Sequence, residues 1–223
     1  TFQAYRIFGD AKESGGRVVE MSLDELDPGE VVVRTRAAGV NYKDALAGHN
    51  AGRVIERFPC NGGIEAVGTV AQSRSPAFRE GDPVILHGRG LGVRHDGGFS
   101  ARIRAPADWL TPLPQGLSLE EATVIGVAGH TAAVAIDLLE LNGLRPGAGP
   151  GAVTGATGGV GSLAVAMLTA RGYEAVAISR KPDRDDYLRR LGASDVRPPP
   201  APGGKVGALE KGEWAGAIDS AGG

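Results

Sequence analysis

The sequence has 223 residues, 42% of them hydrophobic and 22% charged, and a formal net charge of −2. This balance is that of an ordinary globular protein and lacks the concentrated basic face that nucleic acid requires, so no nucleic-acid partner is expected. The one cysteine, Cys60, excludes an internal disulfide and fits a reducing, cytoplasmic location. No apolar run reaches the roughly 20 residues that cross a bilayer, so no membrane partner is expected.

The first half of the sequence predicts short strands separated by turn residues such as Asp27-Pro28-Gly29 and Gly81-Asp82-Pro83. Many short strands of this kind are typical of a compact barrel. The runs that predict strands are Phe2–Phe8, Arg17–Leu23, Val31–Ala37, Ala66–Ala71, Pro83–His87 and Phe99–Ile103. One short helix is expected at Tyr42–Ala47, with Asn41 as its N-cap and Asp44 near the N3 position.

From about residue 118 onward the pattern changes to alternating helices and strands. Ser118 and Glu121 have the spacing of a capping box, and a longer apolar helix is expected at His130–Leu141. The elements expected after it are a strand at Ala152–Thr154, a helix at Gly158–Ala170, a strand at Ala175–Ile178, a helix at Asp183–Leu191 and strands at Ser194–Arg197 and Ala215–Asp219. This alternation predicts a parallel sheet with right-handed crossovers. We therefore expect an α/β protein with a β-rich domain at residues 1–117 and a second domain at residues 118–223.

Two features concern the last part of the chain. The run Pro198–Gly204 is rich in proline and glycine, so it is expected to be a surface loop without a part in the chemistry. The sequence stops where an expected strand enters a turn, which would leave the sheet with an unpaired edge. The second domain is therefore expected to be incomplete at its C-terminal end.

The strongest chemical signal is the glycine-rich run Val153–Ser162 between a predicted strand and a predicted helix. The first turn of a helix leaves N–H groups unpaired and carries the positive end of the helix dipole, and glycines let a diphosphate approach that backbone closely. The alternative is a turn that merely packs tightly. The strand before and the helix after favour a dinucleotide site. The residues expected to contact its diphosphate are Gly158, Gly159, Val160, Gly161 and Ser162.

The second strand of this unit ends in Ser179, Arg180 and Lys181, which lie 18 to 20 residues beyond Gly161. An NAD site carries an Asp or Glu at this strand end, where it binds the ribose 2′-hydroxyl. A carboxylate would repel a 2′-phosphate, whereas arginine grips one with paired, charge-assisted hydrogen bonds. A solvated Arg–Lys pair at the start of the next helix is the alternative. Position and the missing acid together predict NADPH as the cofactor.

The run from Thr154 to Gly161 also fits the glycine motif of the short-chain dehydrogenases. That family places the motif near the N-terminus and needs Tyr-x-x-x-Lys downstream. Here the motif begins only at Thr154, and no tyrosine has a lysine four places on. The tyrosines tested are Tyr5, Tyr42, Tyr173 and Tyr187. The short-chain assignment therefore fails.

A β-rich domain followed by this glycine run resembles the quinone-oxidoreductase side of the medium-chain dehydrogenase/reductase superfamily. The segments that resemble its acryloyl-CoA reductase group most specifically are Asn41–Leu46, Gly97–Ser100, Leu113–Leu117, Glu174–Ser179, Leu191–Ser194 and Trp214–Asp219. The resemblance runs along nearly the whole chain. It implies a GroES-like β-barrel domain followed by a partial Rossmann doubly wound parallel sheet, and often a homodimer. It also implies NADPH-dependent reduction of an α,β-unsaturated acyl-CoA, acryloyl-CoA to propionyl-CoA.

The same resemblance gives two residues a role near the nicotinamide. Tyr42 would be a hydrogen-bond donor or positioning group, although it could equally be a packing residue at a helix start. Thr131 would approach the cofactor, although it could be an ordinary first-turn threonine. Zinc-dependent relatives carry Gly-His-Glu where this chain has Gly63-Ile64-Glu65, so the ligand histidine is replaced and a zinc-independent enzyme is expected.

Two alternative functions remain open from the sequence. An NADPH:quinone oxidoreductase would use the same cofactor residues with a different acceptor. A non-catalytic NADPH-binding sensor or partner protein would bind the nucleotide and turn over neither acceptor. The stretch Gly62–Gly68 departs from the Pro-Gly-Ile-Asp-Phe-Ala-Gly of the acryloyl-CoA reductases, which puts the substrate pocket in question.

Overall fold

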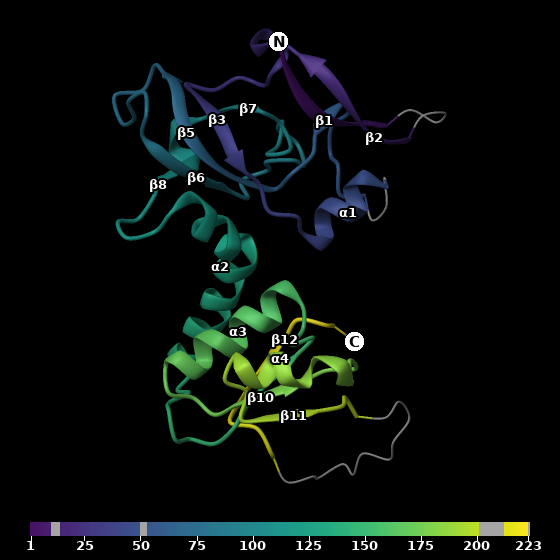
Figure 1. The fold of residues 1–223 in the computed structure, drawn as a ribbon, viewed down its shortest axis with the longest axis vertical. Coiled ribbons are helices and arrows are strands. Elements are labelled where there is room, and N and C mark those ends of the chain that lie inside the picture. Colours follow the sequence, from purple (N-terminus) through teal and green to yellow (C-terminus); the bar gives the residue numbers. More distant parts are fainter. Residues whose placement is uncertain (10–13, 50–52, 201–211, 223) are drawn as a thin grey trace. The chain divides into compact units, whose positions relative to one another are not determined.

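The computed structural model describes residues 1–9, 14–49, 53–200 and 212–222 (Figure 1). The chain separates into two compact units, Thr1–Val127 and Ala128–Gly223. The change in the pattern of expected elements predicts the boundary after residue 117, whereas the two compact units of the structure divide after Val127. Residues 119–127 stay with the first unit because Arg36 pairs with Glu120 at 2.8 Å and the Val127 N–H donates to Glu65 at 2.5 Å.

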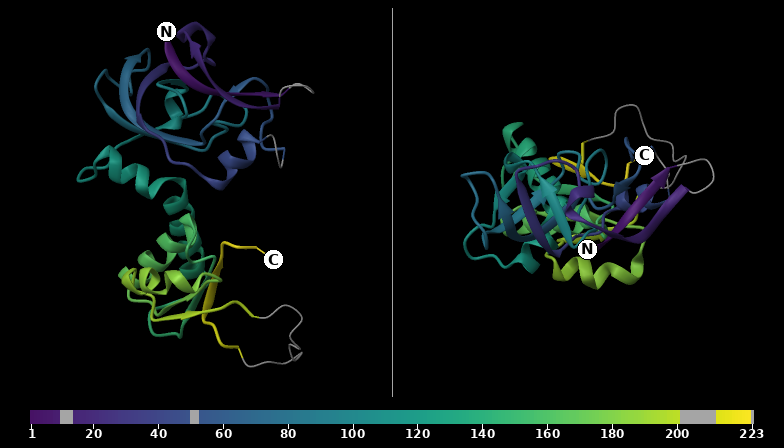
Figure 2. Two further views of the ribbon diagram at one scale, coloured as in Figure 1. Left: turned by 45° about the vertical axis from the view of Figure 1, so that its right-hand side comes forward. Right: turned by 90° about the horizontal axis from the view of Figure 1, so that it is seen from above.

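The strands of the first unit form a five-stranded antiparallel sheet, β7-β3-β5-β6-β8, and a three-stranded one, β2-β1-β4. Their bounds are β1 (Phe2–Gly9), β2 (Ser14–Met21), β3 (Val31–Ala37), β4 (Cys60–Asn61), β5 (Glu65–Ser73), β6 (Pro83–His87), β7 (Arg102–Ala105) and β8 (Leu110–Pro112). Short 3-10 turns lie at Leu23–Glu25 and Ala107–Trp109, and helix α1 spans Tyr42–Gly48. The two further views of Figure 2 show β1 and β2 side by side as a two-stranded ribbon.

The predictions at Val31–Ala37 and Pro83–His87 are confirmed at the same bounds. The strand predicted at Phe99–Ile103 is shifted toward the C-terminus, to Arg102–Ala105, because the Phe99 backbone bonds instead to Tyr5 and Gly62. Strands β4 and β8 were not predicted, since two or three residues are too few to show an alternating pattern.

The large sheet of the first unit is held by a core of branched aliphatic side chains. Val31, Val33, Val84 and Ile103 are fully buried in it and come from three of its strands, β3, β6 and β7. Burying each such side chain stabilises the fold by roughly 1.5–3 kcal/mol. Cys60 lies in a smaller cluster, where burial raises the pKa of its thiol to about 12, so it acts as a packing residue.

A buried carboxylate ties the loop after β6 to the small sheet of the first unit. Asp96 is 1% exposed, and its Oδ1 accepts hydrogen bonds from the Asn61 N–H at 2.9 Å and from Arg6 Nη1 at 3.3 Å. Its Oδ2 accepts the Asp27 N–H at 3.1 Å. Three segments far apart in the sequence therefore meet at one charged group.

The second unit contains a parallel sheet with strand order β11-β10-β9-β12, which confirms the predicted parallel sheet. Its elements are β9 (Gly151–Thr154), α3 (Gly159–Ala170), β10 (Ala175–Ile178), a 3-10 turn (Pro182–Arg184), α4 (Asp185–Arg190), β11 (Asp195–Arg197) and β12 (Gly216–Asp219). Three strands follow in sequence on one side of the sheet, and β12 then pairs with β9 on the other side. This order is that of half a doubly wound dinucleotide fold, and α3 packs on β9 and β10.

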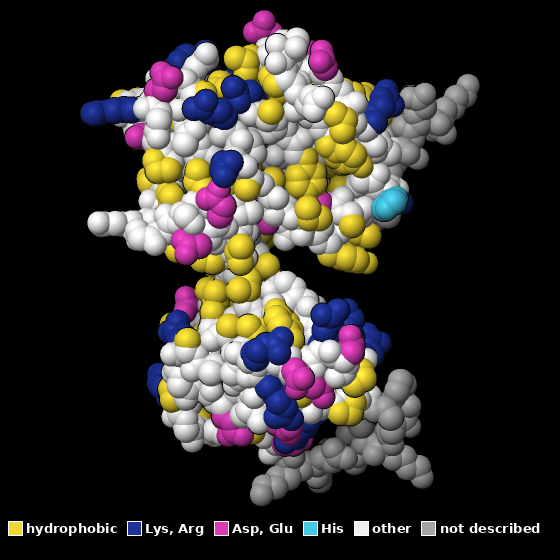
Figure 3. Space-filling model, viewed as in Figure 1, with side chains coloured by type: hydrophobic (Ala, Val, Ile, Leu, Met, Phe, Trp, Pro, Cys, Tyr) yellow, Lys and Arg dark blue, Asp and Glu magenta, His cyan; other side chains and the backbone are white. Residues whose placement is uncertain are grey.

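Helix α2 (Leu119–Leu141) begins with the predicted capping box, in which Glu121 accepts the Ser118 N–H at 2.8 Å. The sequence predicts a helix at His130–Leu141, whereas the structure has one run from Leu119 to Leu141 that is broken at Gly126, with φ 50° and ψ −160°. Its apolar side chains gather at the surface in Figure 3, and Val124 and Leu141 are 75% and 82% exposed.

The prediction that no segment could cross a bilayer needs one correction. With 23 residues and a mean hydropathy of 1.6 over its most apolar stretch, α2 is long and apolar enough by composition. The break at Gly126 leaves residues 127–141 as the continuous part, which is about 22 Å long. Length and composition alone do not distinguish a membrane span from a long apolar helix of a soluble protein, because both pass the same test.

Candidate functional site

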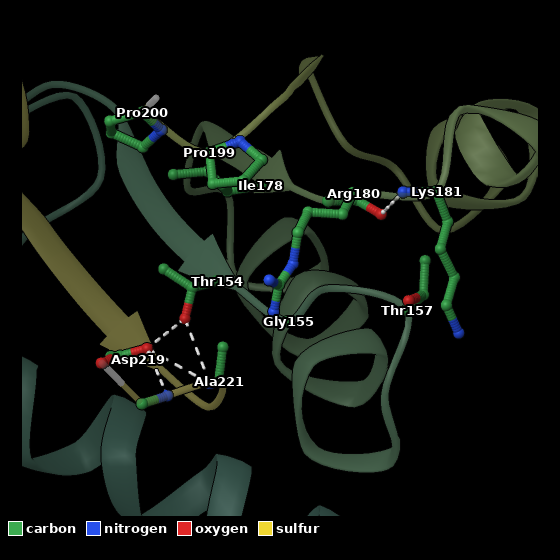
Figure 4. A pocket seen from close by; sticks show the side chains of 12 residues that line it. Thr154, Gly155, Thr157, Ile178, Arg180, Lys181, Pro199, Pro200, Asp219 and Ala221 are labelled. Atoms are coloured by element: carbon green, nitrogen blue, oxygen red, sulfur yellow. Dashed lines mark hydrogen bonds between the residues drawn. The ribbon is translucent and has the colours of Figure 1, made fainter. Parts of the chain in front are cut away.

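A pocket of about 630 Å³ lies in the second unit at the carboxyl ends of its parallel strands (Figure 4). Ligands of open α/β sheets bind at this edge, at the point where the strand order reverses, and ligand pockets typically hold about 300–1,000 Å³. The residues that line it are Thr154, Gly155, Thr157, Ile178, Ser179, Arg180, Lys181, Pro199, Pro200, Asp219, Ala221 and Gly222. Every strand of this sheet thus contributes its end, or the residues just beyond it, to the pocket.

The glycines between β9 and α3 have two different roles. A Cβ on Gly161 would lie 2.4 Å from the Gly155 carbonyl oxygen, so this glycine lets the helix pack against the turn. Gly158 and Gly159 are exposed at the start of α3, and a Cβ on either would lie 3.2–3.3 Å from its nearest neighbour, a tight contact that a shift of a few tenths of an ångström relieves. The packing alternative therefore explains Gly161, whereas Gly158 and Gly159 leave the first helical turn open to a ligand.

This difference predicts opposite effects of one substitution at two glycines. Gly161→Ala is expected to destabilise the second unit by about 1–3 kcal/mol, because the atoms that the new methyl group meets are backbone atoms. Gly159→Ala is the matched control and should change stability by less than about 1 kcal/mol, since alanine favours helix. Urea unfolding followed by Trp214 fluorescence, in a Trp109→Phe background, measures both. Equal losses would contradict the assignment.

Ser179, Arg180 and Lys181 follow β10 directly and line the pocket. The Ser179 hydroxyl accepts the Lys181 N–H at 3.0 Å, which shapes the turn out of the strand. Figure 4 shows the Arg180 side chain pointing back toward Gly155 and the Lys181 side chain extending past Thr157. Two cations therefore face the glycine turn from the end of the neighbouring strand.

A network of hydrogen bonds joins the ends of β9 and β12. The sequence did not predict it. The Thr154 hydroxyl donates to the Asp219 carboxylate and accepts the Ser220 N–H at 3.1 Å. Asp219 also accepts the N–H groups of Ala221 and Gly222, both at 3.2 Å. The Thr154 hydroxyl first, and then these two N–H groups, lower the pKa of the Asp219 carboxyl. The sequence did contain a signal for it. Thr154 and Asp219 each end a predicted strand of a parallel sheet, so both belong at the same edge.

The loop after β11 also needs a correction. It was expected to lie away from the chemistry, but Pro199 and Pro200 line the pocket. They do so because β11 is parallel to β10 and ends at the same edge of the sheet. The rest of the predicted loop, residues 201–204, lies outside the described residues.

Not all the predicted site residues line this pocket. Gly158, Gly159, Val160, Gly161 and Ser162 form the first turn of α3 beside it, as the bounds of that helix show. Thr131 is an exposed residue of α2 in the second unit.

Tyr42 is the first residue of α1 in the first unit and is 81% exposed, so packing at a helix start does not account for its ring. The predicted cap of its helix is confirmed, because Asp44 accepts the Asn41 N–H at 2.8 Å. The pKa of the Asp44 carboxyl is raised overall, because the effect of burial outweighs the opposite effect of the hydrogen bonds from the Asn41 and Ile64 N–H groups.

In residues 1–9, 14–49, 53–200 and 212–222, no group of three or more His, Cys, Asp or Glu side chains could hold a metal ion. At the place of the zinc signature, Ile64 is buried and Glu65 lies 3.5 Å from the Nε2 of His87. Zinc independence stays a prediction.

Comparisons with known proteins place both parts of the chain in one family. The family model of the alcohol dehydrogenase GroES-like domain matches residues 27–115. A Bacillus subtilis protein with the provisional name quinone oxidoreductase YhfP is 46% identical over 223 residues, which are all of this chain and 68% of that protein. Its crystal structure with NAD bound matches with a TM-score of 0.93 and covers 99% of this chain and 68% of its own.

Two further relatives agree with this placement. The acrylyl-CoA reductase AcuI of Ruegeria pomeroyi is 42% identical over 229 residues, covering 96% of this chain and 66% of that protein. The yhdH oxidoreductase of Salmonella enterica in complex with NADP is 41% identical, with a TM-score of 0.92, and the match covers 97% of this chain and 67% of that one. This chain thus spans about two thirds of the length of these relatives. It belongs to the medium-chain dehydrogenase/reductase superfamily, in the quinone-oxidoreductase-like branch that holds YhfP and AcuI.

Proposed function

We propose that this protein is an NADPH-dependent oxidoreductase that reduces the double bond of an α,β-unsaturated acyl-CoA, acryloyl-CoA to propionyl-CoA. The observation that carries the cofactor half is the pair Arg180 and Lys181, which faces the glycine turn where an NAD site carries an acid. The complex of the Salmonella relative with NADP supports it. The acceptor half rests on the similarity to AcuI, whose name gives its substrate.

The residues of the pocket fit a dinucleotide with a 2′-phosphate. The N–H groups at the start of α3 would hold the diphosphate, since Gly158 and Gly159 leave room for it and the helix dipole favours an anion there. Ser179, Arg180 and Lys181 would hold the 2′-phosphate. Thr131 would contact the cofactor nearer the nicotinamide.

The bound nicotinamide supplies the hydride, and the residues of this chain would bind and orient the acceptor. Hydride addition at the β-carbon of an α,β-unsaturated thioester places negative charge on the thioester oxygen, and a proton added at the α-carbon then gives the saturated acyl-CoA. A hydrogen-bond donor fixed near that oxygen stabilises the charge. We assign this role to the hydroxyl of Tyr42, which the start of α1 presents at the surface of the first unit.

Tyr42→Phe tests the donor role, because it removes the hydroxyl and keeps the ring. We expect turnover of acryloyl-CoA to fall roughly 10- to 100-fold while the NADPH dissociation constant stays unchanged. Tyr187→Phe on α4 is the matched control, as the same change at a partly exposed tyrosine outside the proposed site. Steady-state NADPH oxidation gives the result, and unchanged turnover in Tyr42→Phe would exclude the donor role.

A second acceptor is a quinone, favoured by the 46% identity to YhfP. Both acceptors use the same nucleotide residues, so only the acceptor distinguishes them. NADPH oxidation by the full chain should be measured against acryloyl-CoA, longer enoyl-CoA esters and a panel of quinones. Turnover of enoyl-CoA esters alone supports the proposal, and turnover of quinones alone replaces it. Nucleotide binding without turnover of any acceptor indicates the non-catalytic sensor.

A further inference from the structure

Glu65 is a buried acidic residue that the proposed chemistry does not use. It begins β5, is 5% exposed, and follows the isoleucine that stands in place of the zinc-ligand histidine. A carboxylate taken out of water is costly unless it is paired or hydrogen-bonded, so its partners indicate what it does.

The two carboxylate oxygens of Glu65 contact three other segments, because Oε2 also lies 3.5 Å from the Nε2 of His87 at the end of β6. Oε1 accepts a hydrogen bond from the Asn41 side-chain amide at 2.7 Å, and Oε2 accepts the Val127 N–H at 2.5 Å. The backbone comes close on both sides. A Cβ on Gly39 would lie 2.1 Å from Oε1, and a Cβ on Gly126 would lie 2.5 Å from Oε2. The glycines on either side therefore leave room for this carboxylate.

On the Oε2 side, Glu65 completes the break in α2. At Gly126 the helical backbone is interrupted, so residues 127–141 begin as a new helix with the positive end of its dipole at Val127. Glu65 accepts the Val127 N–H and places a negative charge at this helix start. Val127 is also the last residue of the first unit.

On the Oε1 side, Glu65 fixes the start of α1. Asn41 is the N-cap of this helix, and Tyr42 is its first residue. A second link runs in the opposite direction, since the Asp44 carboxylate of α1 accepts the Ile64 N–H at 3.1 Å. The N-terminus of α1 is thus attached to the start of β5 at two points.

We propose that Glu65 is a positioning residue. Its carboxylate holds two segments in place: the start of α1, which carries Tyr42, and the break in α2 at Gly126, where the first unit ends. Its effect on catalysis rests on the proposed function, because it acts through Tyr42. The structural part, the joint hold on α1 and on Val127, stands without it.

Hydrogen–deuterium exchange of the full chain tests the structural part. Glu65→Gln keeps the shape, removes the charge and turns one acceptor into a donor. We expect exchange at least tenfold faster in residues 42–48 and 126–130, and unchanged exchange in β7 and β8. The matched control is Glu80→Gln, the same change at an exposed residue between β5 and β6. Wild-type exchange at both segments in Glu65→Gln would overturn the proposal.

Asn41→Ser keeps a good N-cap residue but cannot reach Glu65, so it separates the two contacts. It should speed exchange in residues 42–48 and leave residues 126–130 as in the wild type. If Glu65→Gln does not fold, Asn41→Ser still tests the contact with α1, because it leaves the Glu65 carboxylate and its hydrogen bond from Val127 in place. Equal exchange in Asn41→Ser and the wild type over residues 42–48 would refute the contact with α1.

Kinetics test the consequence for catalysis. Glu65→Gln should lower kcat for the acceptor at least tenfold and leave both its KM and the NADPH dissociation constant within about twofold. A loss of nucleotide affinity, or a kcat equal to the wild type, contradicts the positioning role. If the wild type binds no nicotinamide nucleotide, the proposed function fails, and the exchange data still decide whether Glu65 holds both segments.

Discussion

Arg180→Ala is expected to weaken NADPH binding by roughly 10- to 100-fold and to leave NADH binding within about twofold. A hydrogen bond to a charged group contributes about 1.5–3 kcal/mol, which corresponds to this range. The Arg180 side chain points across the pocket toward the glycine turn, where a 2′-phosphate would lie beside the diphosphate (Figure 4). Fluorescence titrations of the full chain with both nucleotides give the two dissociation constants.

Arg184→Ala is the matched control for this prediction. Arg184 is an exposed cation one turn further on, where it pairs with Asp183 at 3.2 Å, and it does not line the pocket. It should change neither affinity by more than about twofold. A similar loss for NADPH and NADH in Arg180→Ala would show that Arg180 does not select the phosphate. This comparison matters because YhfP, at 46% identity, was crystallised with NAD.

Asp96→Ala is expected to destabilise the first unit by about 3–5 kcal/mol. Breaking a buried ion pair leaves the partner charge unpaired, and losses of this size follow. Here the change also removes the acceptor of two backbone N–H groups, from Asp27 and Asn61, and one partner of Arg6, whose side chain is 14% exposed. The predicted loss is a large part of the stability of a typical domain.

Urea unfolding measures this loss in the first unit. Trp109 reports on the region, since its ring centroid lies 4.9 Å from that of His95, and a Trp214→Phe background removes the signal of the second unit. Asp24→Ala, at an exposed aspartate of the same unit, is the matched control and should cost less than about 0.5 kcal/mol. Equal midpoints for the two variants would show that the Asp96 contacts add nothing.

The part of the site that could be predicted from sequence depends on local order along the chain. Glycines between a strand and a helix predict an open helix start, and the carboxyl end of the next parallel strand must lie at the same edge of the sheet. For this reason the order of residues along the chain is enough to assign Arg180 and Lys181 to the region of Gly155, and the three residues line one pocket.

The contacts that could not be predicted join residues far apart in the sequence. Glu65 is 62 residues from Val127, and Asp96 is 69 residues from Asp27, so neither pair follows from spacing. Gly126 has the sequence context of an ordinary glycine in an apolar helix. The break in α2 at this glycine is seen only in the structure, from the positive φ of Gly126 and from the Glu65 carboxylate that accepts the Val127 N–H.

The most direct test of the account is a titration of the full wild-type chain with NADPH and with NADH. If the start of α3 holds a diphosphate and Arg180 and Lys181 hold a 2′-phosphate, NADPH should bind saturably and at least tenfold more tightly than NADH. Equal affinities would contradict the role of the two cations. Binding of neither nucleotide would contradict the dinucleotide site itself.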